Sequence, residues 1–492
     1  MNCFMDFKNY QKEIADLQYT CNLLMWELKI IASKDSQLSL VELISKYNNK
    51  LFLLQTSDEY GNLLQKAILD EEFLKLTVEE KRYIKNLLKQ YNEFKLIPFS
   101  FYSELSKLKN ESNIVWQVAK KENNYEKFKP YLEKLITMSK EYYKYLGSNE
   151  SNIYDFMLNE FEGGLNKQQV DNLFNELKCE ILYLMPTETD ESKRISVEYT
   201  HDELISCAKF LLNYIGFDLN KGSLGIYPHG FTQKINDSDI RIAFNETNDP
   251  ISFVSTIIHE GGHGIFEQNI SSKLSVYENT TIGNLTALHE SQSRFFENML
   301  GRNKNFWIPI YDEIKKMLKL NIDIDEFVRL LNSPKAGLIR VNADELTYCM
   351  HIIIRYEIER DLFEGVISVD DLPRIWNEKM HEYLHVDVVN DSDGLMQDVH
   401  WSEAEFGYFP CYLIGSIYAG MFLEQVEKDL GSVDELLQSG RIKEITKYLI
   451  KNIYVNGGAY SSFEIIDKMI GGPVTSKPFI RYLQKKYDKV TK

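Results

Sequence analysis

The sequence predicts a mostly α-helical protein, built as one large single domain over residues 1–492 with a small antiparallel β-sheet beside one of its helices. Three observations predict this fold. Apolar residues recur at three- and four-residue spacing along most of the chain, only one stretch reads as short strands, and the 25 Gly and 11 Pro are too scattered to mark a linker. Within the domain we distinguish a helical N-terminal part, 1–215, from a second part, 216–492.

The helical pattern is clearest between residues 124 and 147. Phe128, Leu132 and Leu135 recur there at the spacing that places side chains on one face of a helix. Gly147 is expected to end this helix, because glycine readily adopts the left-handed conformation found at helix C-termini. The chain keeps this character to about residue 215.

The strands are expected between residues 223 and 244. Two runs of β-compatible residues, 223–227 and 239–244, flank a turn-rich segment, and this arrangement predicts a small antiparallel hairpin. Asp249 can then cap a helix whose first position is Pro250. We expect that helix to run to about Gln268.

Composition argues against several classes of partner. The chain carries 56 Lys and Arg against 73 Asp and Glu, a formal net charge of −17, which opposes binding to nucleic acid or to anionic membranes. Residues 1–14 lack the pattern of a secretory signal, and the apolar run 411–423 is shorter than the roughly 20 residues that span a bilayer. The six cysteines form no C-x-x-C pair. We therefore expect a cytoplasmic protein with reduced thiols.

The segment "HEGGHG", residues 259–264, carries the strongest chemical signal. Residues four apart lie on the same face of a helix, so His259 and His263 can reach one metal ion, while Glu260 is offset by about 100° and can act on a metal-bound water. The three glycines would each weaken a helix by about 1 kcal/mol. We expect these glycines to leave room, because they have no side chains, for a substrate strand or a neighbouring backbone to approach closely.

A second H-E-x-x-H pattern, His381 to His385, competes with the first. Its histidines share a helical face with Arg374 and Glu378, as on an ordinary solvated helix. A catalytic zinc site also needs three protein ligands and an open position. Only the first motif is followed by a helical segment with a suitable third ligand, Glu290, so we favour the first motif as the metal site and interpret the second as a decoy.

Several segments together resemble the carboxypeptidase Taq family of zinc metallocarboxypeptidases. They occur in the family's order over nearly the whole chain: "DIRIA" (239–243), "HEGGHGIFEQ" (259–268), "LHESQSRFFEN" (288–298), "IRVNAD" (339–344), "GLMQDVHW" (394–401) and "GYFPCYLIG" (407–415). The resemblance implies a helical subunit with a long groove, a small sheet at the active site, and homodimers. It further implies removal of single residues from peptide C-termini with broad specificity.

The same resemblance implies roles for individual residues. His259, His263 and Glu290 would bind one Zn²⁺ per chain, with Co²⁺ or Mn²⁺ as substitutes, and Glu260 would be the general base that activates a zinc-bound water. The remaining candidates are oxyanion donors and substrate-binding residues: Tyr408 or Tyr412 with His400 for the oxyanion, Arg340 for the substrate carboxylate, and Arg241 and His229 for the end of the peptide.

Two positions depart from the family's motifs. Its H-P-F pattern is His229-Gly230-Phe231 in this chain, and its D-x-R-x-T pattern ends in Ala243. Since proline restricts the unfolded chain, Gly230→Pro is expected to be tolerated and even stabilising by about 0.4–1 kcal/mol. Two other functions remain open at this point: an oligoendopeptidase with a similar helical fold, and an inactive helical scaffold that binds peptides.

Overall fold

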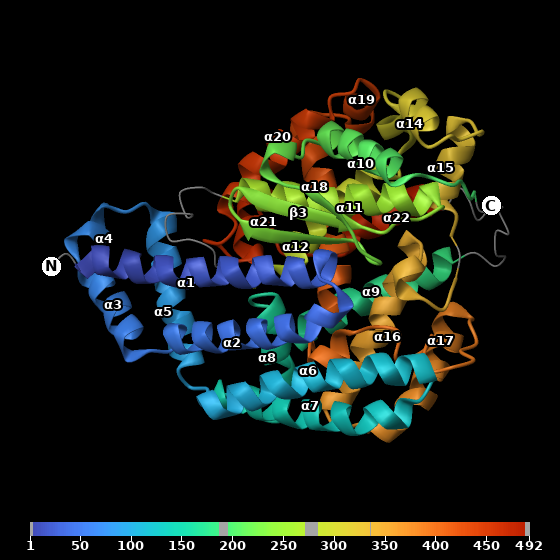
Figure 1. The fold of residues 1–492 in the computed structure, drawn as a ribbon. Coiled ribbons are helices and arrows are strands. Elements are labelled where there is room, and N and C mark those ends of the chain that lie inside the picture. Colours follow the sequence, from blue (N-terminus) through green and yellow to red (C-terminus); the bar gives the residue numbers. More distant parts are fainter. Residues whose placement is uncertain (1–2, 186–194, 271–283, 335, 488–492) are drawn as a thin grey trace. The chain divides into compact units, whose positions relative to one another are not determined.

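A computed structural model describes residues 3–185, 195–270, 284–334 and 336–487 (Figure 1). It confirms the predicted fold class: helices dominate, and three short strands form one small sheet. The chain forms two compact units, each assembled from three segments. Unit 1 contains 1–95, 193–331 and 422–473, and unit 2 contains 96–192, 332–421 and 474–492. Residue 215 therefore lies inside unit 1, and the single-domain description stays a prediction.

Unit 1 combines an N-terminal group of helices with the sheet and the helices around it. Its elements are α1 (Cys3–Trp26), η1 (Glu27–Ile31), η2 (Lys34–Ser36), α2 (Gln37–Gln55), α3 (Asp58–Leu69), α4 (Glu71–Lys75), α5 (Val78–Phe94), α10 (His201–Ile215), η3 (Leu219–Lys221), β1 (Leu224–Ile226), β2 (Phe231–Asn236), β3 (Asp239–Phe244), α11 (Pro250–Asn269), α12 (Thr286–Arg294), η5 (Phe295–Gly301), α13 (Lys304–Trp307), α14 (Tyr311–Met317), α15 (Ile324–Asn332), α19 (Val433–Gln438), α20 (Ile442–Asn452), η9 (Tyr454–Asn456) and α21 (Ser462–Ile470).

Unit 2 is helical throughout its described part. Its elements are α6 (Phe99–Glu122), α7 (Tyr125–Tyr145), α8 (Ile153–Phe161), α9 (Lys167–Leu184), η6 (Arg340–Asn342), α16 (Glu345–Phe363), η7 (Val369–Asp371), α17 (Leu372–Leu384), η8 (His400–Glu403) and α22 (Lys477–Tyr487), while α18 (Phe409–Leu430) contributes to both units. The predicted end of α7 is confirmed, because the helix stops at Tyr145 and Gly147 has a φ of 95°. The stretch 186–194 of the predicted N-terminal helical part lies outside the described residues.

The sheet differs from the predicted hairpin in its pairing. The strand order is β1-β3-β2, with β2 antiparallel to β3 and β1 parallel to it. The two predicted runs, 223–227 and 239–244, are thus parallel neighbours, and the prediction that they form a hairpin was wrong. The segment between them contains a strand of its own, β2, and a tight turn joins β2 directly to β3.

Helix α11 packs along the sheet and against two other helices of unit 1 (Figure 1). It begins as predicted: Asp249 accepts hydrogen bonds from the backbone N–H groups of Ile251 and Ser252, at 2.9 and 3.2 Å, and Pro250 is the first helical residue. Its end at Asn269 agrees with the expected end near Gln268.

The glycines of α11 are explained by what lies against them. A Cβ on Gly262 would approach the carbonyl oxygen of Gln292 and the Cα of Ser293 in α12, both to 2.7 Å. The other two glycines face side chains: Gly261 packs against Leu212 and Ile215 of α10, and Gly264 against Phe217 and Ile242. Of the two uses predicted from the sequence, the close approach of a neighbouring backbone is the one observed at Gly262.

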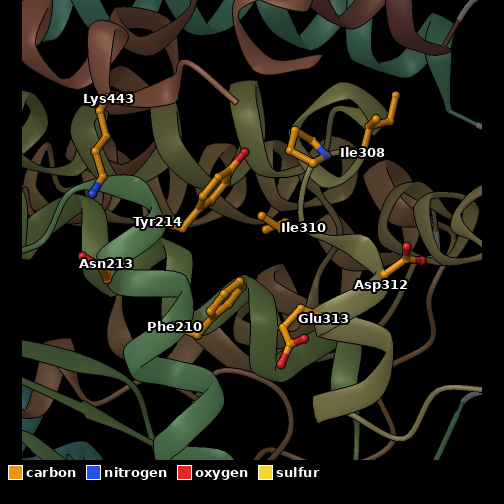
Figure 2. Close-up of a pocket in the computed structure, with 9 residues that line it drawn as sticks. Phe210, Asn213, Tyr214, Ile308, Ile310, Asp312, Glu313 and Lys443 are labelled. Atoms are coloured by element: carbon orange, nitrogen blue, oxygen red, sulfur yellow. The ribbon is translucent and has the colours of Figure 1, made fainter. Parts of the chain in front are cut away.

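A surface hollow of about 540 Å³ also lies in unit 1 (Figure 2). Aromatic rings of Phe210 and Tyr214 line it together with the charged side chains of Asp312, Glu313 and Lys443. None of the residues that the sequence singles out for chemistry is among those lining it.

Two sequence-based expectations about the chain as a whole concern thiols and membranes. All six cysteines are free, and all lie in the described ranges. Among the helices described, none combines the length and apolarity that a membrane crossing requires.

Candidate metal centre and active site

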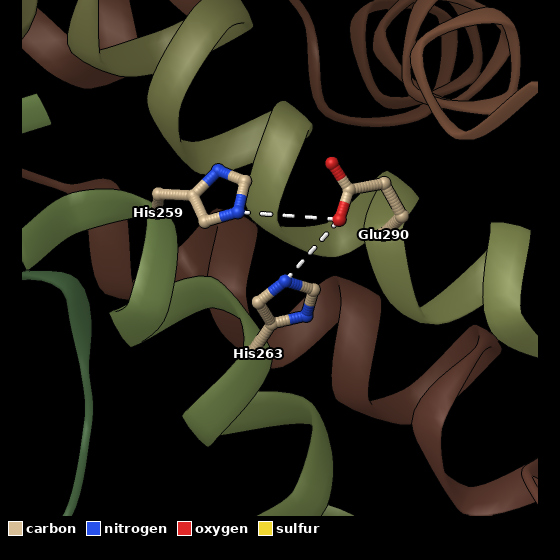
Figure 3. Close-up of side chains that lie close together, drawn as sticks. All are labelled: His259, His263 and Glu290. Carbon is tan, nitrogen blue, oxygen red and sulfur yellow. Dashed lines mark ion pairs between the residues drawn. The ribbon is translucent and has the colours of Figure 1, made fainter. Parts of the chain in front are cut away.

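His259, His263 and Glu290 come together in unit 1 as the sequence predicted (Figure 3). The Glu290 Oε2 atom lies 3.3 Å from His263 Nε2 and 3.9 Å from His259 Nε2. The three ligand atoms lie within 4.8 Å of one another. Within the part of the chain that the structure describes, this is the group of His, Cys, Asp and Glu side chains compact enough to hold a metal ion.

The donor set fits zinc. Two imidazole nitrogens and one carboxylate oxygen are ligands typical of catalytic zinc, whose tetrahedral bonds of about 2.0–2.1 Å would place ligand atoms roughly 3.4 Å apart. Burial lowers the pKa of His263 to about 3, so this imidazole is neutral and its nitrogen can donate a lone pair. Burial raises the pKa of Glu290, but the opposing effects of Arg294 and His259 are larger and keep it well below its usual range. Glu290 is therefore a carboxylate.

Behind the ligands lies a second carboxylate that the sequence analysis missed. Glu297 Oε2 is 2.9 Å from Nδ1 of His259, which leaves Nε2 of that ring to face Glu290. Arg294 contacts both acids, with Nε 2.7 Å from Glu290 Oε1 and Nη1 3.3 Å from Glu297 Oε2. Metal-binding histidines commonly bind a carboxylate through their other nitrogen, so an acidic residue in the segment after Glu290 was a signal that could have been used.

Glu260 is buried and held by one hydroxyl. Thr232, on β2, donates a hydrogen bond of 2.7 Å to Glu260 Oε2. Burial raises the pKa of the Glu260 carboxyl, against the lowering effects of His259 and Thr232. A raised pKa suits a group that must accept a proton and release it again. Thr232 was missed because β2 itself was not predicted.

Gly230 lies directly against the Glu260 side chain, and this overturns the expectation that proline would fit there. A Cβ at residue 230 would be 2.7 Å from Thr256 Cγ2 and 3.0 Å from Glu260 Oε1. Proline carries a Cβ in that position, so Gly230→Pro would press on the two side chains instead of stabilising the turn. The neighbouring His229 is exposed, in the bend between β1 and β2.

The second H-E-x-x-H pattern lies near the exposed end of α17. The His381 side chain is 69% exposed and pairs with Asp387 at 2.8 Å, and His385 has a left-handed φ of 54° just beyond the helix. The two histidines therefore lack the helical geometry that would direct both rings to one ion. Neither belongs to the candidate metal group.

Arg241 already has a partner within its own strand. Its guanidinium binds Asp239 through Nε and Nη2, the latter at 2.7 Å, and lies over the Trp26 ring. The threonine that the family's D-x-R-x-T pattern would place after Arg241 is replaced by Ala243, which is fully buried on β3.

Arg340 belongs to a buried cluster in unit 2. Asp398 bridges two arginines: its Oδ1 atom lies 2.9 Å from Nε of Arg340, and its Oδ2 atom lies 2.7 Å from Nε of Arg355. Burial raises the pKa of Asp398, but the two guanidinium groups outweigh it and keep that pKa far below its usual range. Two cations thus share one anion, which leaves one positive charge uncompensated among these three side chains.

His400, Tyr408 and Tyr412 lie together in the same unit. Nε2 of His400 is 3.0 Å from the Tyr412 hydroxyl, and the ring centroid of Tyr408 is 5.3 Å from that of His400. Burial, together with Arg340, lowers the pKa of His400 to about 3, so its ring is neutral. The structure brings His400 and both candidate tyrosines together, and Tyr412 is the tyrosine hydrogen-bonded to the histidine; their role as oxyanion donors stays a prediction.

A buried carboxyl, Glu359, holds the segment that carries these residues. Trp401 donates its ring N–H to Oε1 at 2.6 Å, and the backbone N–H of Gly407 donates to Oε2 at 2.9 Å. Tyr154 donates to Oε2 as well, at 3.0 Å. His400 and Tyr408 are the immediate neighbours of Trp401 and Gly407. Glu359 was not singled out in the sequence because its partners come from distant segments.

The chain matches the carboxypeptidase Taq (M32) metallopeptidase family over residues 6–487. The chain belongs to this family. It is 35% identical over 500 residues to carboxypeptidase 1 of Bacillus subtilis, covering 98% of this chain and 99% of that one. It is 27% identical to thermostable carboxypeptidase 1 of Thermus thermophilus, covering 98% of each. The crystal structure of an M32 carboxypeptidase from Deinococcus radiodurans R1 superimposes with a TM-score of 0.92 at 25% identity over the full length of both chains.

Membership confirms the resemblance seen in the sequence and makes this carboxypeptidase Taq family member a metallocarboxypeptidase, a peptide hydrolase with a metal cofactor. The oligoendopeptidase and inactive-scaffold alternatives are not supported. Neither departure replaces a candidate metal ligand or Glu260, although Gly230 lies against the Glu260 side chain.

We predict that a methyl group at residue 230 disturbs the base. In Gly230→Ala the new Cβ meets Thr256 Cγ2 and Glu260 Oε1, and overpacking of this kind costs about 1–3 kcal/mol. Where that energy displaces Glu260 in the transition state, kcat falls by about 5- to 150-fold. Steady-state kinetics and melting curves of the variant and wild type measure both effects.

Thr256→Ser supplies the control because it removes Cγ2 while keeping the hydroxyl. The double variant should recover part of the lost kcat. A Gly230→Ala or Gly230→Pro enzyme with wild-type kcat and an unchanged or higher melting temperature would show that the loop moves aside freely.

Glu359 is expected to make stability depend on pH. Burial raises its pKa to about 7, so its stabilising contribution is complete below the ordinary carboxyl pKa and is lost as pH rises through 7. Relative to Glu359→Gln, which does not titrate, wild type should lose about 2–3 kcal/mol between pH 5 and pH 8. Urea denaturation of both proteins between pH 5 and pH 8 measures their free energies of unfolding. The same pH dependence in wild type and Glu359→Gln would contradict the prediction.

Proposed function

We propose that this enzyme is a zinc-dependent carboxypeptidase that removes C-terminal amino acids from peptides with broad specificity. The observation that carries the proposal is the convergence of His259, His263 and Glu290, with Glu260 adjacent on the same helix. The formal net charge of −17 supports a protein that binds neither nucleic acid nor membranes. The family resemblance supports a cytoplasmic homodimer whose partners are peptides with a free C-terminus.

Zinc bound by these three side chains would supply Lewis-acid polarisation of the scissile carbonyl. Glu260 is the residue that accepts a proton from the attacking water and later delivers it to the leaving amine. Two neighbours prepare it for this task. Thr232 engages Oε2, and Gly230, having no side chain, leaves space beside Oε1. Oε1 is therefore the atom we expect to take the proton.

Recognition of the substrate's terminal carboxylate is assigned to Arg340. A surplus positive charge in a buried cluster favours an anion, because an uncompensated buried charge is strongly unfavourable. Asp398 contacts Nε and Nη2 of Arg340, and Tyr348 accepts a 3.0 Å hydrogen bond from Nη1. These contacts fix the plane of the guanidinium and leave one N–H hydrogen free on each of Nη1 and Nη2. Two parallel N–H groups of this kind can bind both oxygens of a carboxylate.

The oxyanion that develops during attack needs donors besides the metal. A neutral His400 with its hydroxyl partner Tyr412, and the adjacent Tyr408, supply candidates. Arg241 and His229 are proposed to bind the end of the peptide, in line with the family's motifs.

Metal content and turnover are expected to separate in variants of the metal group. Glu290→Ala should lose bound zinc because a ligand is gone, whereas Glu260→Gln should keep zinc and lose nearly all turnover because the base is gone. Elemental analysis after gel filtration and hydrolysis of a blocked dipeptide measure the two quantities.

His381→Ala is the matched control, since it alters the other H-E-x-x-H motif. Zinc content and turnover should both stay at wild-type levels. Loss of zinc from His381→Ala, or retention of zinc by Glu290→Ala, would contradict the assignment.

The enzyme should act only on peptides with a free C-terminus. We expect kcat/KM for a peptide acid to exceed that for its amide by roughly 30-fold or more, the effect of losing a charge-assisted contact worth about 2–5 kcal/mol. Arg340→Lys keeps the positive charge but loses the two parallel N–H groups of the guanidinium, so it should lose most of the preference for the acid. The ratio of kcat/KM for acid and amide is also measured for Arg241→Lys. Mass spectrometry identifies the cleavage products. Internal cleavage of the peptide, or equal hydrolysis of acid and amide, would refute carboxylate recognition.

A further inference from the structure

We propose that Arg294 is a positioning residue that confines Glu290 to offering a single oxygen to the metal. This inference rests on the proposed zinc site. A catalytic zinc ion needs a position left open for water and substrate, and a glutamate that binds through both oxygens would occupy it. The constraint on Glu290 is therefore part of what makes the site catalytic.

The two oxygens of Glu290 face different partners. Oε2 faces the histidines, 3.3 Å from His263 Nε2 and 3.9 Å from His259 Nε2. Oε1 accepts a 2.7 Å hydrogen bond from Nε of Arg294, one helical turn later on α12. Both side chains are largely buried, with 7% and 12% of their surfaces exposed, so water competes little for this bond. Rotation of Glu290 toward a two-oxygen mode would break it.

The same guanidinium supports a second ligand from behind. Its Nη1 lies 3.3 Å from Oε2 of Glu297, the oxygen that is 2.9 Å from Nδ1 of His259. One arginine thus contacts the carboxylate of one ligand and the carboxylate that orients another. A lysine, with a single charged nitrogen, could not hold both acids in this planar arrangement.

Arg302 provides a matched control within the same region. It contacts Glu297 through Oε1 at 3.3 Å, and it also donates to the Asn298 side chain and the Leu331 carbonyl. Its replacement removes a buried positive charge beside Glu297, one of the two acids that Arg294 contacts. It leaves the hydrogen bond between Arg294 and Glu290 in place.

The test uses cobalt-substituted enzyme, because the visible absorption of Co²⁺ weakens as its coordination number rises from four to five. Arg294→Met removes the donor. Arg294→Gln keeps an N–H at the ε position, where the arginine Nε donates, but removes the charge. At saturating Co²⁺ we expect the Met variant to lose absorption intensity and about 10- to 100-fold in kcat. The Gln variant should stay closer to wild type, and Arg302→Met should keep the wild-type spectrum.

A folded Arg294→Met protein with the wild-type cobalt spectrum would overturn the proposal. If that variant does not fold, a crystal structure of zinc-loaded wild type decides instead: one Glu290 oxygen on the metal with the other on Arg294 supports the proposal, and two oxygens on the metal overturn it. The Glu290→Ala variant distinguishes failure of the proposed zinc site from failure of the role proposed for Arg294. If it keeps the wild-type cobalt spectrum, the zinc site itself is wrong, whereas loss of that spectrum leaves the Arg294 result to be judged alone.

Discussion

The close contact between α11 and α12 at Gly262 is the constraint on which the candidate active site depends. A Cβ at this residue would lie 2.7 Å from backbone atoms of α12, so the two helices can come this close only without one. Glu290, which extends from α12, then reaches the two histidines of α11. Three glycines lower the helix propensity by about 1 kcal/mol each, and burial of α11 against its neighbours offsets that loss.

Burial also dictates how charge is arranged around each candidate site. Removing a charge from water is expensive, so buried carboxylates need nearby cations or donors. In unit 1 the carboxylates of Glu290 and Glu297 are matched by Arg294 and Arg302. In unit 2 the ratio is reversed, with Arg340 and Arg355 sharing Asp398. The first arrangement presents oxygen to a cation, and the second favours an anion.

Much of the metal site could be predicted because its information is local. The spacing of His259 and His263, the adjacency of Glu260, and a later helix with Glu290 follow from helical geometry and ligand chemistry. The supporting side chains could not be predicted in this way. Thr232 lies on a strand within a turn-rich segment, and Glu297 follows α12 in a π-helical turn. The partners of Glu359 come from two segments, around Tyr154 and between Trp401 and Gly407. Contacts of this kind depend on packing between distant parts of the chain.

By itself the sequence determined the helical class, the start and end of α11, the candidate metal ligands and the likeness to one peptidase family, because periodicity, capping and motif spacing are properties of short segments. Only the tertiary structure decided which strands pair, which side chains support the candidate metal ligands, and whether residue 230 has room for a side chain. The physical reason is that strand pairing, ligand convergence and close packing are relations between segments far apart in the chain. For Gly230, the decisive neighbours were Thr256 and Glu260, on a helix that begins 20 residues later.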